Sequence, residues 1–146
     1  KMKTLNEMKI SFKSKSENEG FGRTAVCAFA ALLDPQIEDI ADIRTAVSEA
    51  VTNCIVHAYR ETEGVIEITA RILEGNEIYI RVKDRGCGIP DISRAMEPLF
   101  TTAPCEERAG LGFAVMESFM DNLKVKSTVG KGTVVTMRKK LGGNNE

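Results

Sequence analysis

A single helical segment with two different faces is the feature that most limits how this chain folds. Within the stretch from Val47 to Tyr59, Glu49, Asn53 and His57 follow one another at four-residue intervals, so a helix places them in one polar stripe. Apolar residues recur at helical spacing on another face: Ile40, Ile43, Val47, Val51, Cys54 and Ala58. We therefore predict a helix that packs against a core and offers a carboxylate, a carboxamide and an imidazole on its other side.

The remaining segments alternate between strand and helix patterns. We expect strands at about 8–13, 65–73, 78–83, 125–128 and 133–139, and helices at about 16–33, 35–61 and 110–122. Ser16 and Glu19 form a capping-box pattern, Asp34 and Pro35 suit the start of the second helix, and Gly75 suits a hairpin. This order predicts an α/β (α+β) two-layer sandwich, with a mixed, mostly antiparallel sheet and three main helices on one face.

Length and composition exclude several classes of protein. The 146 residues suit one domain over 1–146, ordered over about 5–141 with a frayed tail at 142–146. A net charge of -1 argues against direct nucleic-acid binding. We find no apolar run of about 18–20 residues, which a membrane span requires, and no signal peptide pattern. The four cysteines show no C-x-x-C spacing, so we expect reduced thiols without a zinc site, in the cytoplasm.

Four short motifs are candidates for chemistry. They are Glu49-x-x-x-Asn53, Asp84-x-Gly86-x-Gly88, Gly110-x-Gly112 and Gly132-Thr133. Each alone has an ordinary structural explanation, because glycines form turns and loops. Together they supply groups that ATP requires.

The second and fourth motifs suit the adenine base. Asp84 ends a strand facing inward, where a buried carboxylate needs hydrogen-bond donors, and the exocyclic amine of adenine is one. Gly86 and Gly88 let the backbone approach the flat base. Thr133 has a hydroxyl that reaches the adenine side directly or through a water.

The first and third motifs suit the phosphates. A helix that opens at Gly110 and Gly112 presents free amides and a positive dipole end to phosphate oxygens. Asn53 is a suitable Mg²⁺ ligand, since Mg²⁺ takes few protein ligands and bridges phosphates. Glu49 lies one turn away and is our candidate base for an attacking hydroxyl or water.

The motifs E-A-V-T-N, D-R-G-C-G, G-L-G-F and G-K-G-T resemble, in order and spacing, the N, G1, G2 and G3 boxes of the GHKL (Bergerat-fold) ATP-binding superfamily. More narrowly, S-E-A-V-T-N-C-I-V-H-A-Y and E-P-L-F-T-T resemble the bacterial anti-sigma factor serine kinases, those of sporulation most of all. The resemblance covers about residues 5 to 141.

This resemblance implies an ATP/ADP site with Mg²⁺ on Asn53, Glu49 as acid/base residue, and Asp84 and Thr133 at adenine. It adds Leu111 between the two glycines, and a lid at about 98–109. In the lid, Thr101, Thr102 and Arg108 are expected near the phosphates. It also implies a kinase that inhibits an RNA polymerase sigma factor when ATP is bound and phosphorylates a serine of an anti-anti-sigma factor. A homodimer is expected, and Arg23 on the first helix is our candidate partner contact.

Three alternatives stay open at this point. The chain could be a nucleotide-gated binding module without turnover, although the intact Glu49 argues against it. It could be a general stress-response relative, since such a relative shares all four boxes. An ATPase of the gyrase kind is less favoured, because it needs a lysine from a following domain. His57 as a phosphoacceptor is also disfavoured, since it lies on the helix that lines the predicted ATP site.

Overall fold

The computed structural model describes residues 2–60, 62–96 and 104–142, with the backbone alone for 104–111. Its elements, in chain order, are β1 (Thr4–Lys13), α1 (Glu17–Ala30), the 3₁₀ turn η1 (Ala31–Leu33), α2 (Ile37–Asn53), the π-helical turn η2 (Cys54–Ala58), β2 (Val65–Leu73), β3 (Glu77–Asp84), α3 (Ile92–Ala95), α4 (Pro104–Phe119), β4 (Asn122–Thr128) and β5 (Gly132–Lys140).

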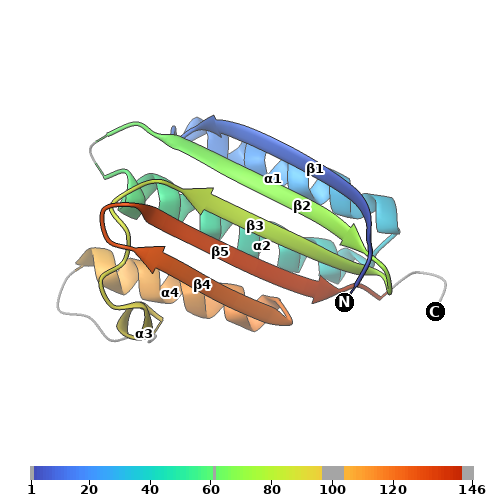
Figure 1. Cartoon of the computed structure of the whole chain (residues 1–146). Coiled ribbons are helices and arrows are strands. Elements are labelled where there is room, and N and C mark those ends of the chain that lie inside the picture. The colour runs from blue at the N-terminus through green and yellow to red at the C-terminus, as the bar shows by residue number, and fades with distance from the viewer. Residues whose placement is uncertain (1, 61, 97–103, 143–146) are drawn as a thin grey trace.

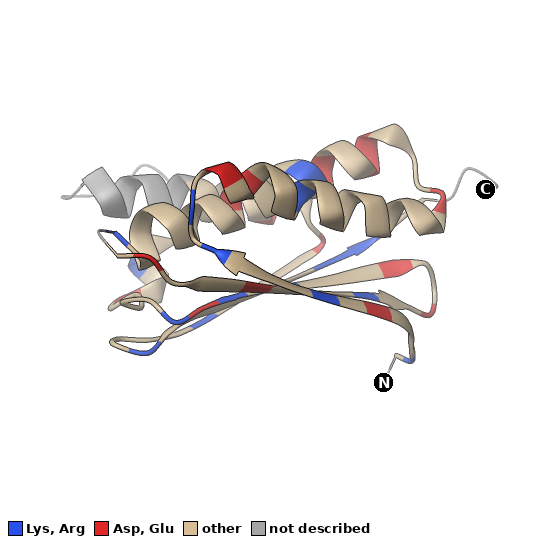
Figure 2. Cartoon of the chain, turned by 90° about the horizontal axis from the view of Figure 1, so that it is seen from above, with Lys and Arg blue, Asp and Glu red and all other residues tan. Residues whose placement is uncertain are grey.

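The strands form one five-stranded sheet in the order β1-β2-β3-β5-β4, and every described pairing is antiparallel. The helices α1, α2 and α4 cover one face of this sheet, as Figures 1 and 2 show. The predicted two-layer architecture is therefore confirmed. Strand alternation decides which side chains face the helices, and in β3 these are Ile78, Ile80, Val82 and Asp84. The inward direction of Asp84, predicted from the sequence, follows from this alternation.

The core lies between the sheet and α2, which runs between α1 and α4 (Figure 1). The buried face of α2 carries Ile43, Ala46, Val47, Ala50 and Val51, close to the predicted apolar stripe. From α4, Phe113 and Met116 complete this core. Because apolar burial contributes about 25 cal/mol per Å², this packing fixes α2, and with it the polar stripe on its other face.

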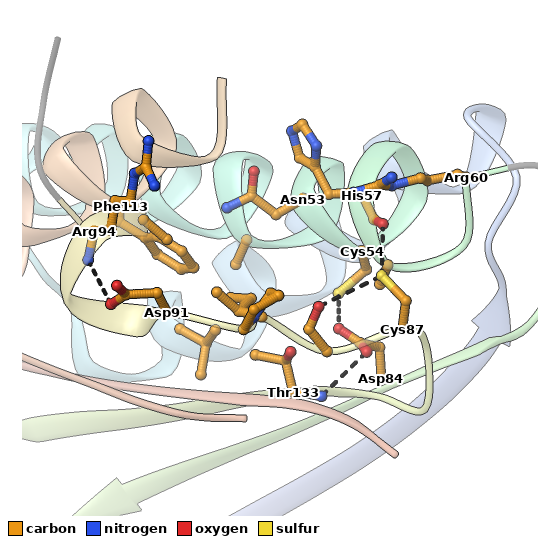
Figure 3. A pocket seen from close by; sticks show the side chains of 17 residues that line it. Asn53, Cys54, His57, Arg60, Asp84, Cys87, Asp91, Arg94, Phe113 and Thr133 are labelled. Atoms are coloured by element: carbon orange, nitrogen blue, oxygen red, sulfur yellow. Dashed lines mark hydrogen bonds between the residues drawn. The ribbon is translucent and has the colours of Figure 1, made fainter. Parts of the chain in front are cut away.

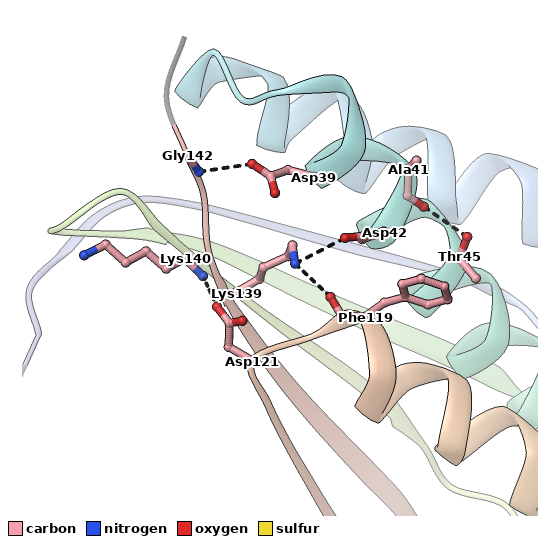
Figure 4. A network of polar contacts seen from close by, with 9 residues as sticks. All are labelled: Asp39, Ala41, Asp42, Thr45, Phe119, Asp121, Lys139, Lys140 and Gly142. Atoms are coloured by element: carbon pink, nitrogen blue, oxygen red, sulfur yellow. Dashed lines mark hydrogen bonds and ion pairs between the residues drawn. The ribbon is translucent and has the colours of Figure 1, made fainter. Parts of the chain in front are cut away.

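At the C-terminal end of α4, polar contacts fasten the two layers together (Figure 4). The buried Lys139 of β5 donates to the carbonyl of Phe119, the last residue of α4, at 2.9 Å. The same Nζ lies 3.4 Å from the carboxylate of Asp42 on α2. Nearby, Asp39 accepts from the backbone N–H of Gly142 at 3.0 Å. A cation at a helix C-terminus is favourable, so Lys139 holds α4 and α2 to the same strand.

Of the two predicted helix starts, the first is confirmed and the second is wrong. Ser16 is the N-cap residue of α1, which begins at Glu17, although its side chain makes no capping hydrogen bond. Asp34 adopts the left-handed conformation (φ 49°) at the C-terminal end of η1, and the N-cap residue of α2 is Gln36, so α2 begins at Ile37. An aspartate tolerates this conformation better than most residues, which explains why the Asp-Pro pattern terminates one element without starting the next.

The third long helix begins at Pro104 and not at Gly110, so the prediction of a helix N-terminus at Gly110 is wrong. Proline is favoured in the first helical position, and the two glutamates that follow it suit the positive end of the helix dipole. Glycine costs about 1 kcal/mol in a helix, which the rest of the helix tolerates. Gly110 and Gly112 therefore lie inside α4, where their amides belong to the helix.

The last turn of the central helix is wider than an α-helix. From Cys54 to Ala58 the chain forms a π-helical turn, closed by a hydrogen bond of 3.1 Å from the N–H of Tyr59 to the carbonyl of Cys54. A π turn holds an extra residue, so the four-residue stripe of the prediction does not continue unchanged from Asn53 to His57. Such turns are frequent at functional sites, and this one borders the pocket described next.

Candidate functional site

One pocket is lined by four of the predicted site residues. It lies between the end of α2 with η2, the loop after β3, α3, α4 and β5 (Figure 3). Its lining residues are Ala50, Asn53, Cys54, His57, Ala58, Arg60, Asp84, Cys87, Gly88, Ile89, Pro90, Asp91, Arg94, Ala95, Phe113, Thr133 and Val135. Asn53, Asp84, Gly88 and Thr133 were predicted for the site, and the topology brings them together from three distant parts of the chain.

Asp84 lies at the floor of the pocket, which we define as Cys54, Asp84 and Thr133. The residue is 5% exposed, and protein donors reach both oxygens of its carboxylate. Oδ1 accepts from the backbone N–H of Gly86 at 2.9 Å and from that of Thr133 at 3.2 Å. Oδ2 accepts from the thiol of Cys54 at 3.4 Å. The predicted requirement for donors to this carboxylate is thus largely met within the protein.

Burial governs the ionisation of both groups in this contact. It raises the pKa of Asp84, and the hydrogen bonds from Gly86, Cys54 and Thr133 oppose this effect. Burial also raises the pKa of Cys54 well above its usual range, and the neighbouring charge of Asp84 adds to the effect. The thiol therefore stays protonated, which makes it a hydrogen-bond donor and not a nucleophile.

The glycines after β3 are explained by the protein's own packing. A Cβ at Gly86 would collide with the carbonyl of Ala58 at the end of η2. Gly88 has a φ of +78°, and a Cβ there would collide with the carbonyl of Thr128. The neighbouring N–H of Cys87 donates to the same Ala58 carbonyl at 3.0 Å. Close approach of the loop to η2 and β4 is thus a reason for these glycines beyond the predicted approach of a base.

Ser127 does not line the pocket but supports its floor, and the sequence motifs did not indicate it. Its hydroxyl accepts from the N–H of Ile89 at 2.8 Å and lies 2.8 Å from the hydroxyl of Thr133. This holds the loop after β3 to the last hairpin. The register of that hairpin pairs Ser127 with Thr133. The predicted strands and turn around Gly130 contained this signal, because a tight turn fixes the residues that face each other.

At the other end of the pocket, helices α2 and α4 approach closely through Gly112. A Cβ there would lie 3.1 Å from Nδ2 and 3.2 Å from Oδ1 of Asn53, and 3.2 Å from Oε2 of Glu49. We call Glu49, Asn53 and Gly112 the α2–α4 contact. The Nδ2 atom of Asn53 is buried and has no hydrogen-bond partner among the described residues. An unsatisfied buried donor is costly, so this atom marks a place suited to a polar ligand.

The other predicted residues either do not line the pocket or lack a described side chain. Thr101 and Thr102 lie outside the described residues, as does the first half of the predicted lid, 98–103. The second half, 104–109, is the first part of α4 and not a loop. Arg108 and Leu111 belong to the described backbone of α4, without their side chains. Arg23 lies on α1, where its guanidinium is 3.4 Å from Glu19, and it does not line the pocket.

The pocket also holds charged residues that the motifs did not indicate. Arg60 follows η2, and Asp91 and Arg94 belong to the start of α3, where Asp91 accepts from the N–H of Arg94 at 3.1 Å. No three His, Cys, Asp or Glu side chains among the described residues are grouped to hold a metal ion by themselves. No described helix is long and apolar enough to cross a membrane.

Known proteins resemble the chain over nearly its whole length. Residues 18–139 match the family described as histidine kinase-like ATPase domain. An anti-sigma F factor of Caldanaerobacter subterraneus subsp. tengcongensis is 61% identical over 143 residues, covering 98% of this chain and 99% of that protein. The anti-sigma F factor of Clostridium acetobutylicum is 54% identical over 136 residues, covering 93% and 94%.

Solved structures agree on the fold. The structure of the RsbU and RsbW domains of a Mycobacterium tuberculosis protein matches with a TM-score of 0.69 at 21% identity, over 94% of this chain and 33% of that one. A histidine kinase domain of Erythrobacter litoralis matches with a TM-score of 0.59 at 21% identity, over 84% and 61%. The family identified from the sequence and its class of serine kinases are confirmed by the sequence relatives. The chain belongs to the anti-sigma F factors, built on a histidine kinase-like ATPase domain.

Proposed function

We propose that this chain binds ATP in the pocket of Figure 3, holds a sporulation sigma factor inactive while ATP is bound, and phosphorylates a serine of an anti-anti-sigma factor. The observation that supports a nucleotide site is that the two ends of the pocket offer different polar groups. The floor offers a buried carboxylate, and the α2–α4 contact offers a buried donor without a partner. Family membership supports the kinase and sigma-factor roles.

In this proposal the adenine base lies on the floor. Asp84 accepts from the amino group of the base, and Thr133 contacts the same side through its hydroxyl or a water. The backbone of Gly86 and Gly88 carries the loop that borders the base. Thr101, Thr102, Arg108 and the backbone of Gly110, Leu111 and Gly112 are proposed to lie near the phosphates.

The phosphates lie toward the α2–α4 contact, where the buried N–H donor of Asn53 suits a phosphate oxygen. Asn53 would hold Mg²⁺ through its side-chain oxygen, and the ion when bound neutralises phosphate charge. Glu49 takes the proton of the incoming serine hydroxyl. The serine oxygen then bonds to the γ-phosphorus as the bond from that phosphorus to the bridging oxygen breaks, and ADP leaves with that electron pair.

The partner surface is proposed to include the first helix. Arg23 is 41% exposed on its side chain, and Phe21 on the same helix is 55% exposed. Exposed aromatic and arginine side chains are enriched at protein interfaces. The edge position of β1 in the sheet is compatible with the expected homodimer. We propose a cytoplasmic protein, in keeping with a sigma factor as partner.

The experiment that tests this function is a transfer assay with γ-labelled ATP, Mg²⁺ and purified anti-anti-sigma proteins, followed by phosphoamino-acid analysis. We expect phosphoserine on the added protein. Tight ATP binding without label on any added protein would contradict the kinase and favour a nucleotide-gated binding module. Release of free phosphate without acceptor would favour an ATPase of the gyrase kind.

A further inference from the structure

Cys54 lines the floor of the pocket, and the proposed phosphoryl transfer does not use it. The residue is 3% exposed, and its Sγ donates to Oδ2 of Asp84 at 3.4 Å (Figure 3). A buried cysteine in a helix ordinarily packs as a small apolar residue and requires no polar partner. Here the thiol is a further donor to a buried carboxylate, beside the two backbone N–H groups.

The number of donors limits what else Asp84 can bind. A carboxylate has about four acceptor positions. Two backbone donors, from Gly86 and Thr133, occupy those of Oδ1, and the thiol of Cys54 occupies one of Oδ2. About one position therefore remains, on Oδ2. Because donors hold both oxygens, the otherwise broad terminal torsion of the side chain is fixed, and so is the direction of this last position.

We propose that Cys54 is a positioning residue for purine selectivity, which holds Oδ2 of Asp84 so that its remaining acceptor position faces an amino group. A 6-amino purine presents a donor to this oxygen, whereas a 6-oxo purine presents an acceptor and leaves two acceptors facing each other. The inference rests on the proposed function and deepens it. It assigns the choice between ATP and 6-oxo nucleotides to a residue that need not touch the nucleotide.

The test compares ATP with ITP, which differ at the position in question. Binding of both to the full chain is measured by calorimetry at one Mg²⁺ concentration, for the wild type, Cys54→Ala and Cys54→Ser. We expect Cys54→Ala to weaken ATP binding roughly three- to tenfold, the range of one neutral hydrogen bond, and to change ITP binding little. The ratio of the two affinities then falls by the same factor. Cys54→Ser keeps a donor and is expected to restore the ratio.

A matched control separates positioning from packing. Cys27 is a half-buried cysteine on α1 whose Sγ is 4.0 Å from the carbonyl of Ile40, outside the pocket. Cys27→Ala should leave the ATP to ITP ratio unchanged. Should Cys54→Ala lose its fold by circular dichroism, Cys54→Val takes its place, since valine fills the volume but donates no hydrogen bond.

Two results overturn the inference by itself. The first is that the wild type prefers ATP over ITP and a folded Cys54→Ala variant shows the same ratio of the two affinities. The other is an equal loss of affinity for ATP and ITP, which indicates packing alone. A wild type that binds neither nucleotide overturns the proposed function as well, and is distinguished from the other two by the wild-type measurement.

Discussion

The floor of the pocket and the α2–α4 contact are built in opposite ways. At the floor, the carboxylate of Asp84 accepts from two backbone N–H groups and a thiol, and Ser127 fastens the adjoining loop. At the α2–α4 contact, the Nδ2 atom of Asn53 is buried and has no hydrogen-bond partner in the part of the chain that the structure describes. A site whose one end is satisfied by the protein binds its ligand there without rearrangement. The end with an unsatisfied group gains most from the ligand, because binding removes an existing penalty.

The two ends also have different proposed roles, since the floor contacts the base and the α2–α4 contact holds the reacting groups. We therefore expect substitutions at the floor to change nucleotide binding and substitutions at the α2–α4 contact to change the reaction. The largest effect is therefore expected at Glu49. We expect Glu49→Ala to lower phosphoryl transfer about 10²–10⁴-fold, the range for a positioned base, while ATP binding changes little. Transfer of γ-label to an anti-anti-sigma serine measures the first effect, and calorimetry the second. Undiminished transfer in the variant would assign the base to another residue.

At the floor, Asp84→Asn should act on binding itself. The amide places two donors where Gly86, Thr133 and Cys54 already donate, so at least one contact is lost. We expect ATP affinity to fall about 10–100-fold, as for a lost hydrogen bond to a charged group. Calorimetry with the folded variant measures this. Unchanged affinity would remove Asp84 from the adenine site.

Alanine substitutions at Gly86 and Gly112 test the difference between the loop beside the floor and the α2–α4 contact. At Gly86 an added Cβ meets the backbone of Ala58, which cannot move without moving η2. We expect Gly86→Ala to lower the free energy of unfolding by about 2 kcal/mol, as steric strain in a packed loop does. At Gly112 the added Cβ meets the ends of the Asn53 and Glu49 side chains. Alanine is the better helix former there by about 1 kcal/mol, so stability should be nearly unchanged.

The same two variants, Gly86→Ala and Gly112→Ala, should also differ in their effect on phosphoryl transfer. Gly112→Ala displaces the two groups proposed to hold magnesium and accept the proton, so transfer should fall about tenfold or more in a fully folded protein. Denaturant unfolding and the transfer assay, run on both variants, test this. A Gly112→Ala variant that loses stability and keeps its activity would reverse the assignment of the two ends.

Much of the floor could be predicted because its signals are local. Alternation along β3 directs Asp84 inward, and the turn around Gly130 brings the last two strands together. The contact of Cys54 with Asp84 could not be predicted in this way. It depends on the packing of the central helix over β3, and the pattern of α2 shows Cys54 simply as part of the apolar stripe.

The α2–α4 contact was harder to predict, because it depends on the packing of two helices that are distant in the sequence. The sequence showed Gly110 and Gly112 as the start of a helix, since glycine weakens helices. In the structure the helix begins at Pro104, and Gly112 serves the close approach to Asn53. A glycine needed by a neighbouring helix has the same sequence pattern as one needed by a turn. The residues on α2 could be named in advance, but not the element they face.

The smallest expected effect concerns pH at the floor. Burial raises the pKa of Asp84 above its value in the unfolded chain. As pH falls, the folded protein therefore takes up this proton before the unfolded chain does, and stability rises. The contribution is present below the unfolded pKa and is lost as pH rises through the folded pKa. We expect the free energy of unfolding of wild type minus that of Asp84→Asn to increase between about pH 7 and pH 4.

Other carboxylates titrate alike in both proteins and cancel in this difference, which chemical unfolding measures at each pH. A flat difference, or one that decreases toward acid pH, would contradict the burial of a charge at Asp84. ATP affinity of the wild type should change in the other direction over the same interval, because a protonated carboxyl is a weaker acceptor than a carboxylate. Toward acid pH, the difference in free energy of unfolding should therefore increase while the ATP affinity decreases. This combination is expected if the charge on Asp84 favours ATP binding and disfavours folding.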